Sequence, residues 1–172
     1  MLSKYLGLVL ALFSCIALVA QPPMSKQEFE KEYQRRIKLE YINEVYIPID
    51  LADAFVQLNK LIDDSSRASF KSMSEEEAAS KLFFGFGRWM IVNWGFYEGS
   101  RLSHYIKELG ITFPDDMAQF IMVSYHRNLN RKPLDVKAQI EYYQEKRRKE
   151  HEERLSKGTI IKTETRDKTK GQ

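Results

Sequence analysis

The sequence predicts an all-α fold, a small irregular helical bundle that ends in a long charged helix and a disordered tail. Signals for helix starts recur along the chain, and apolar residues follow them at helical spacing. The one segment rich in β-branched residues, 45–49, is short and contains a proline, which central strands avoid. Because 43% of the 172 residues are hydrophobic, the chain has enough apolar side chains for one globular core.

The first twenty residues have the pattern of an export signal. Lys4 supplies a positive charge, residues 5–20 are almost all apolar, and two prolines follow. An apolar run of 16 residues is short for a membrane-spanning helix, which needs about 20. We therefore expect a signal peptide cleaved after Ala20, and an exported protein that is periplasmic or secreted. Two alternatives remain open: lipidation of Cys15, because the residues before it resemble a bacterial lipobox, and an uncleaved membrane anchor.

The cysteine count and the charge distribution exclude several classes of protein. Cys15 is the only cysteine, so the cleaved protein would have no disulfide, no thiol catalysis and no cysteine-bound zinc. Residues 146–172 hold ten Lys or Arg and five Asp or Glu, whereas residues 21–145 hold sixteen and nineteen. Nucleic-acid-binding domains carry basic residues on a folded face, so we expect no nucleic-acid partner. A solvated basic tail accounts for the net charge of +3, and contact of that tail with anionic lipid headgroups is the alternative.

A charged helix is expected at the start of the folded part. Ser25 and Glu28 form a capping box, and the helix should run to about residue 40, within a lead-in that covers residues 21–41. Its few apolar residues are spaced by four and would form a narrow stripe that docks on the body: Phe29, Tyr33, Ile37 and Tyr41.

Capping residues also predict the next helices. Asp50 should cap a helix with one clear apolar face, made of Leu51, Ala54, Phe55, Leu58, Leu61 and Ile62. The Asp-Asp-Ser-Ser sequence at 63–66 should end this helix. Ser74 and Glu77 then form a second capping box, for a helix that runs towards residue 82.

Glycine, serine and proline set the expected boundaries between residues 83 and 130. A helix over about 84–93 would contain Gly85 and Gly87, each of which costs about 1 kcal/mol against alanine. We therefore expect another element to approach this helix closely. Four further residues should mark helix ends or starts: Gly95, Gly110, Ser100 and Pro114.

The last helix should run from about residue 134 to residue 157. Its first half has an apolar face, whereas from Lys146 it is almost wholly charged and should project into water. Residues 159–172 are typical of disorder. The chain is thus expected to consist of a leader (1–20), a charged helical lead-in (21–41), a helical domain (42–145) and a charged helix extension with a disordered basic tail (146–172).

The most plausible binding site is the glycine-bounded loop that leads into the helix starting at Ser100. Free backbone N–H groups at a helix N-terminus and the fixed donors of an arginine suit a carboxylate, a phosphate or a partner side chain. The candidate residues of this loop are Trp94, Gly95, Gly99, Ser100 and Arg101. The alternative is structural, with the tryptophans in the core and Arg101 paired with Asp115 or Asp116.

His126 and Arg127 form a second candidate site, for which a role at the end of a helix is the alternative. No catalytic residue, metal site or cofactor is predicted. The three histidines, His104, His126 and His151, lack the spacing of metal ligands. Adjacent Asp115 and Asp116 point about 100° apart around a helix, so they cannot easily act on one bond together.

Several of these motifs resemble a family of small, mostly bacterial domains known only as a domain of unknown function. The shared elements are Trp-Gly-x-x-x-Gly-Ser-Arg-Leu at 94–102, Gly-Ile-x-His-Pro-Asp-Asp-Met-Ser at 110–118, and Tyr-x-Arg-x-Leu at 125–129. This chain departs from the family at Phe113, where His is usual, and at Ala118, where Ser is usual. The resemblance implies a domain over about 42–145 and brings no activity. A family chemistry that used the His would be in doubt here.

Two hypotheses of function follow. The first is a non-enzymatic binding or interaction module of the bacterial envelope, with the loop at 94–101 and the helix start at Asp115 and Asp116 as its working surface. Its partner would be an unknown protein or a small anionic ligand, with membrane contact only through the leader or a lipid anchor. The alternative is a small envelope hydrolase or transferase in which Arg101 binds an anion and Asp115, Asp116 or His126 transfers protons.

Overall fold

The computed structural model describes residues 25–158, and this part of the chain is mostly helical, which confirms the all-α prediction. In chain order its elements are α1 (Lys26–Arg36), β1 (Tyr41–Ile42), β2 (Val45–Tyr46), α2 (Leu51–Leu61), α3 (Asp64–Ser72), α4 (Glu75–Lys81), the π-helical turn η1 (Phe83–Gly87), α5 (Arg88–Asn93), α6 (Arg101–Glu108), α7 (Pro114–Leu129) and α8 (Val136–Ser156). The predicted leader, Cys15 and the predicted disordered tail lie outside the described residues. Within residues 25–158, no helix is both long and apolar enough to cross a membrane.

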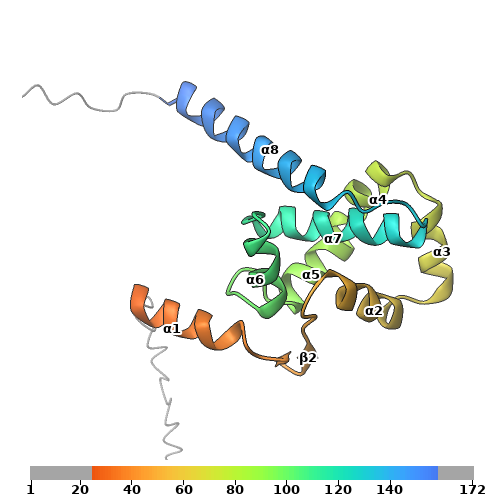
Figure 1. Cartoon of the computed structure of the whole chain (residues 1–172), viewed down its shortest axis with the longest axis horizontal. Helices are drawn as coiled ribbons and strands as arrows, with labels where there is room; N and C mark the ends of the chain where they lie inside the picture. The colour runs from red at the N-terminus through yellow and green to blue at the C-terminus, as the bar shows by residue number, and fades with distance from the viewer. Residues whose placement is uncertain (1–24, 159–172) are drawn as a thin grey trace, which may run out of the picture.

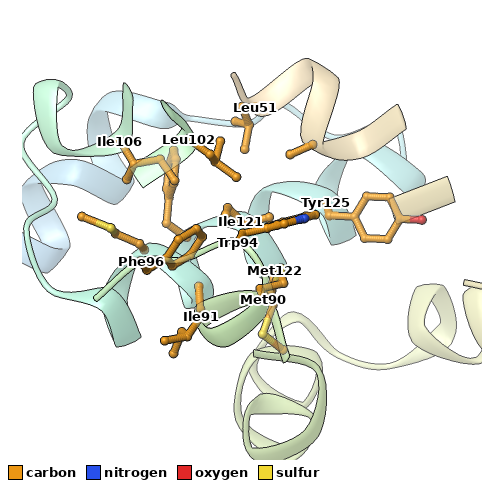
Figure 2. Close-up of a cluster of buried hydrophobic side chains, with 14 of the residues drawn as sticks. Leu51, Met90, Ile91, Trp94, Phe96, Leu102, Ile106, Ile121, Met122 and Tyr125 are labelled. Atoms are coloured by element: carbon orange, nitrogen blue, oxygen red, sulfur yellow. The ribbon is translucent and has the colours of Figure 1, made fainter. Parts of the chain in front are cut away.

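Helix α7 is the centre of the fold, and the other body helices pack around it (Figure 1). It begins at Pro114, as predicted, with Asp115 and Asp116 in its first turn. Its buried side chains cover more than one face, which is typical of a helix enclosed by neighbours. Figure 2 shows part of the core, where Ile121 and Met122 of α7 lie among side chains of α2, α5 and α6. Trp94 lies fully buried in this cluster.

A small hairpin follows α1, where the sequence suggested only one extended segment. β1 and β2 pair in antiparallel fashion, with Tyr41 opposite Tyr46. The two turn residues, Asn43 and Glu44, have φ values of 48° and 66°, the backbone of a tight hairpin turn. Tyr41 therefore belongs to a strand and not to the apolar stripe of a helix, because α1 ends at Arg36.

Helix α3 was not predicted from the sequence. Asp63 ends the preceding loop and also caps α3, because its side chain accepts a hydrogen bond from the Ser66 backbone. The Asp-Asp-Ser-Ser segment, expected to end the preceding helix, therefore starts α3, whereas α2 already ends at Leu61. The helix contributes Phe70, which is buried and stacks on the Tyr125 ring with the centroids 5.7 Å apart.

The glycines before α5 lie in a π-helical turn and not in an α-helix. A Cβ at Gly87 would lie 2.7 Å from the Phe83 ring and 3.2 Å from the Met122 sulfur, so the expected close approach is confirmed there. At Gly85 the expectation is wrong, because a Cβ would meet nothing within 4 Å.

Two arms extend from the body, α1 and α8 (Figure 1). α1 has no buried residue and docks through a few polar contacts. The far half of α8 is exposed, but the expectation that it projects into water from Lys146 onwards is only partly correct. Lys146 and Arg147 are partly buried against the body, where both pair with Asp116. Beyond them, many of the charges pair within the helix, so this helix does not present an unbroken basic face.

The capping boxes predicted at Ser25 and Ser74 are both present, and the second gives a pH prediction. Hydrogen bonds from Lys81 and from Ser74 lower the pKa of Glu77 to about 2. A carboxyl whose pKa is lowered by folding stabilises the fold above its unfolded pKa, and this contribution is lost as the pH falls from about 4.5 towards 2. We expect an NMR titration of the Glu77 carboxyl to have its midpoint near pH 2. A midpoint near 4.5, with Glu77→Gln leaving acid unfolding unchanged, would contradict this.

Candidate functional site

The loop at 94–101, the first candidate from the sequence, has its polar groups largely engaged. Ser100 is fully buried and caps α6 as predicted. Its Oγ accepts from the Ser103 backbone N–H at 3.2 Å, and Ser103 Oγ accepts from the Ser100 N–H at 2.8 Å. Two of the backbone N–H groups at this helix start therefore already donate hydrogen bonds within the capping box, and they are not free to bind an anion.

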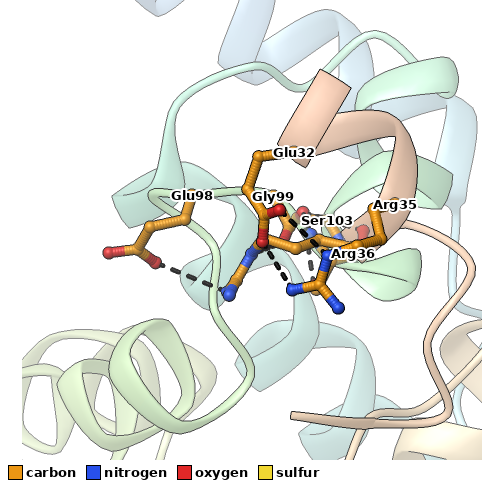
Figure 3. A network of polar contacts seen from close by, with 7 residues as sticks. Glu32, Arg35, Arg36, Glu98, Gly99 and Ser103 are labelled. Carbon is orange, nitrogen blue, oxygen red and sulfur yellow. Dashed lines mark hydrogen bonds and ion pairs between the residues drawn. The ribbon is translucent and has the colours of Figure 1, made fainter. Parts of the chain in front are cut away.

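Side chains of α1 lie against both glycines of this loop. Figure 3 shows Arg36 of α1 beside Gly99. Gly95 and Gly99 have φ values of 64° and 91°. Arg36 donates from Nε to the Gly99 carbonyl at 2.9 Å, and its guanidinium lies 3.8 Å from the Glu98 carboxylate. A Cβ at Gly95 would lie 2.7 Å from the Arg36 guanidinium, and a Cβ at Gly99 would overlap the Tyr33 ring. Both glycines are required by backbone conformation and by the docking of α1.

We expect Gly99→Ala to lower the free energy of unfolding by about 2 kcal/mol or more, because it forces a side chain into left-handed backbone and against Tyr33. Gly85→Ala is the matched control and should be neutral or stabilising by up to about 1 kcal/mol, because the space around Gly85 is open. Urea unfolding followed by circular dichroism compares the two. Equal effects would show that α1 does not pack on Gly99.

Arg101 ties the hairpin to α6, and the sequence-based alternative had the wrong partner. Its Nε donates to the Ile47 carbonyl at 2.6 Å, and its guanidinium lies 4.9 Å from the centre of the Tyr46 ring. Tyr46 in turn donates to Asp53 at 2.8 Å. Arg101 Nη2 is buried and has no partner among the described residues. These contacts do not include the carboxylates of α7, and they favour an architectural role.

Asp115 and Asp116 have different environments despite being adjacent. Asp116 is 1% exposed and binds Arg147 through two hydrogen bonds, of 2.5 and 2.8 Å, and Lys146 at 3.1 Å. Asp115 is half exposed, with the Arg88 guanidinium 3.8 Å away. Neither pairs with Arg101 in the structure. Asp116 thus anchors α8 on the start of α7.

His126 and Arg127 anchor the other end of α7. His126 is buried, and its Nε2 lies 3.0 Å from the Met73 carbonyl; because a carbonyl only accepts, Nε2 carries the hydrogen. Arg127 binds both carboxylate oxygens of Glu75, each at 2.7 Å, and its hydrogen bonds hold the pKa of Glu75 below the usual value. This is the helix-end role given above as the alternative.

The residues of the enzyme hypothesis do not converge. Asp116 and His126 lie ten positions apart on α7, which places them about 15 Å apart along its axis. Arg101 faces the hairpin, and Asp116 is closed off by its two cations. Across residues 25–158, no group of three or more His, Cys, Asp or Glu side chains is placed to hold a metal ion.

A groove between α4, α7 and α8 is a further candidate site for a ligand, and it was not predicted from the sequence. Its volume is about 520 Å³. Each helix contributes residues three or four positions apart, which put them on one helical face. The lining consists of Glu75, Glu76, Ala79 and Ser80 from α4, Gln119, Val123 and Arg127 from α7, and Asp135, Ala138, Gln139, Tyr142 and Tyr143 from α8 and its cap. Arg127 is the one residue of the sequence-based candidate set in this lining.

The lining of this groove combines apolar side chains with acidic ones. Ala79, Val123 and Ala138 form the apolar walls together with the two tyrosines, of which Tyr142 is 62% exposed. Glu76 and Asp135 supply exposed carboxylates. The sequence indicates one wall of this site, because positions 119, 123 and 127 are spaced by four and share one face of a helix. Their facing partners on α4 and α8 depend on tertiary packing.

The fold and the groove define a small helical module with one central helix, two arms and an open surface site. Residues 47–129 match the family described as Domain of unknown function (DUF6794), which confirms the resemblance to an uncharacterised domain family. The match includes the loop at 94–101 and helices α2 to α7, whereas α1 and α8 lie outside it. No curated protein and no solved structure matches the chain.

Proposed function

We propose that this chain is a non-enzymatic binding module that holds a segment of a partner polypeptide in the groove between α4, α7 and α8. The observation that carries this proposal is the groove itself, which combines a volume of about 520 Å³ with apolar walls and exposed carboxylates. Ligand sites in proteins have volumes of this order, and they combine apolar lining with a few polar groups.

A polypeptide suits the groove better than a small compact ligand. Three helices border it and it opens to solvent, as in grooves that receive a peptide laid along them. Tyr142 offers a large exposed ring at its edge, and tyrosines of this kind are frequent anchors of protein interfaces. We propose that the partner, predicted from the sequence to be an unknown protein, contacts this groove and not the loop at 94–101.

Peptide selection tests the proposal. A phage-displayed library of random 12-residue peptides is selected on the purified protein, and binding is then compared with two variants. Ala138→Trp fills the groove from α8, whereas His151→Trp adds the same side chain at an exposed position near the far end of that helix. We expect the selected peptides to bind Ala138→Trp at least about tenfold more weakly, and to bind His151→Trp as they bind the wild type.

Two results would contradict the proposal. One is that no peptide is selected above background. The other is that the peptides bind Ala138→Trp as well as the wild type while its circular dichroism is unchanged. If the peptides bound Ala138→Trp normally but bound Gly99→Ala weakly, the loop at 94–101 would be supported as the working surface.

We further propose that the module is exported to the bacterial envelope, on the support of the sequence pattern over residues 1–20. In this proposal, membrane contact occurs only through the leader or a lipid anchor, and no nucleic acid is bound. Expression in a bacterium, fractionation and N-terminal sequencing test it. A periplasmic protein that begins at Gln21 is expected. A lipidated N-terminus at Cys15 or an intact leader would favour one of the two alternatives, and a cytoplasmic intact chain would contradict export.

A further inference from the structure

The charges that line the groove do not balance. Glu75, Glu76 and Asp135 oppose the single cation Arg127. Arg127 is already held by Glu75 through two hydrogen bonds of 2.7 Å and by the Leu134 carbonyl at 2.9 Å. Because a paired guanidinium attracts little further anion, the groove presents a negative potential to a ligand.

Glu76 and Asp135 are the carboxylates that remain accessible. Glu76 is exposed and forms no ion pair among the described residues. The Asp135 side chain is 59% exposed and lies 3.4 Å from Arg127. Lys132 lies near enough to lower the pKa of Glu75, but it is not part of the lining. These two carboxylates are therefore open to a cation.

Next to these carboxylates, the groove offers surfaces that suit the rest of a basic side chain. Ala79, Ala138 and Tyr142 are apolar surface on which a long aliphatic stem can lie. The exposed Tyr142 ring also attracts a cation that lies over its face. A lysine or arginine side chain matches both features, since it has an apolar stem and a charged head.

Gln139 at the groove has an unsatisfied acceptor. Its Nε2 donates to the Leu134 carbonyl at 2.7 Å and to Ser124 Oγ at 3.1 Å, and the carbonyl fixes the amide orientation because it can only accept. Gln139 is 93% buried, and its Oε1 is left with no donor among the described residues. An N–H group brought to this atom would satisfy it.

We propose, on the basis of the function proposed above, that the groove selects a lysine or arginine side chain of the partner polypeptide. The head of that side chain lies by Glu76 and Asp135, and its stem lies along the wall formed by α8. An acidic or phosphorylated peptide is disfavoured by the same carboxylates. This is opposite in sign to the small anionic ligand expected for the loop at 94–101.

The test uses the peptides selected on the wild-type protein. Each lysine and arginine in a selected peptide is replaced by glutamine, and binding is measured by fluorescence anisotropy against the wild type and two charge-reversal variants. Glu76→Lys combined with Asp135→Lys reverses the charge of the two exposed carboxylates of the groove. Glu153→Lys is the matched control, because Glu153 is an exposed carboxylate near the far end of α8.

We expect the selected peptides to be enriched in lysine and arginine over the unselected library. One basic residue in each should account for about a tenfold loss of affinity when it is replaced, and the double reversal should weaken binding to a similar extent. Glu153→Lys should have no effect, and the difference between variants should shrink at high salt.

Failure of this inference is distinguishable from failure of the proposed function. Peptides that lose binding to Ala138→Trp, but carry no excess of basic residues and bind the double reversal normally, overturn the charge inference and leave the groove as the binding site. A failure to select any peptide overturns both. Enrichment of acidic or phosphorylated peptides in the groove overturns the charge inference alone.

Discussion

Replacing Trp94 with alanine is expected to lower the free energy of unfolding by about 3–5 kcal/mol, the largest loss that we expect from a single change in this chain. Trp94 is fully buried, and its ring meets the Trp89 ring edge-on with the centroids 5.7 Å apart. A cavity of indole size in a packed core cannot collapse fully, so the lost contacts are not replaced.

Two further variants test whether the loss of stability follows the burial of the tryptophan side chain. Trp89→Ala should cost less, because Trp89 is only partly buried. Trp94→Phe should cost less than about 2 kcal/mol, because it keeps an aromatic ring and removes an indole N–H that has no partner among the described residues. Urea unfolding followed by circular dichroism measures all three. A Trp94→Ala protein as stable as the wild type would contradict the role of Trp94 in the core.

The second large effect is expected at Asp116. Its replacement by alanine should cost about 2–4 kcal/mol, because Arg147 and Lys146 lose the buried carboxylate that both bind. The two cations are partly exposed and regain some hydration, which keeps the loss below that of a fully buried pair. The far part of α8 should also loosen, because this cluster is its anchor on α7.

Asp115 supplies the matched control, since it is adjacent on the same helix and half exposed. Asp115→Ala should cost less than about 1 kcal/mol. Amide hydrogen exchange along α8 should accelerate in Asp116→Ala and stay unchanged in Asp115→Ala. Equal exchange in both variants would contradict the anchoring role of Asp116.

Local signals predicted much of this fold. The caps at Ser25, Asp50, Ser74 and Ser100, and the proline start at Pro114, depend on residues within one helical turn, and all are found in the structure. The glycines with positive φ at Gly95 and Gly110 also end helices as expected. These features are predictable because the interacting groups are three or four residues apart.

The missed features depend on partners that are distant in sequence or on ambiguous local signals. Arg101 binds a carbonyl 54 positions away and Asp116 binds an arginine 31 positions away, so neither partner is given by spacing. The hairpin turn contains Asn43 and Glu44 without a glycine, which weakens its signal. The Asp-Asp-Ser-Ser segment fits both a helix end and a helix start, but in the structure α2 ends before it, at Leu61, and the segment starts α3.

The candidate site was predicted least well, for the same reason. The loop at 94–101 has the residues of an anion site, but its covering helix α1 and its internal caps become evident only when the chain is folded. The groove forms only where three helices pack together. Hydrogen bonds of Asp116 and Arg127 hold α8 and the residues before it in place beside α7.

Mapping a bound peptide on the protein by NMR tests the central claim most directly. A selected peptide is titrated into ¹⁵N-labelled protein, and shifts of backbone amides are compared between the groove and the loop at 94–101. The account predicts the largest shifts around Ala79, Val123 and Ala138, with little change at Gly99 and Arg101. The largest shifts at Gly99 and Arg101, with an unchanged groove, would contradict it.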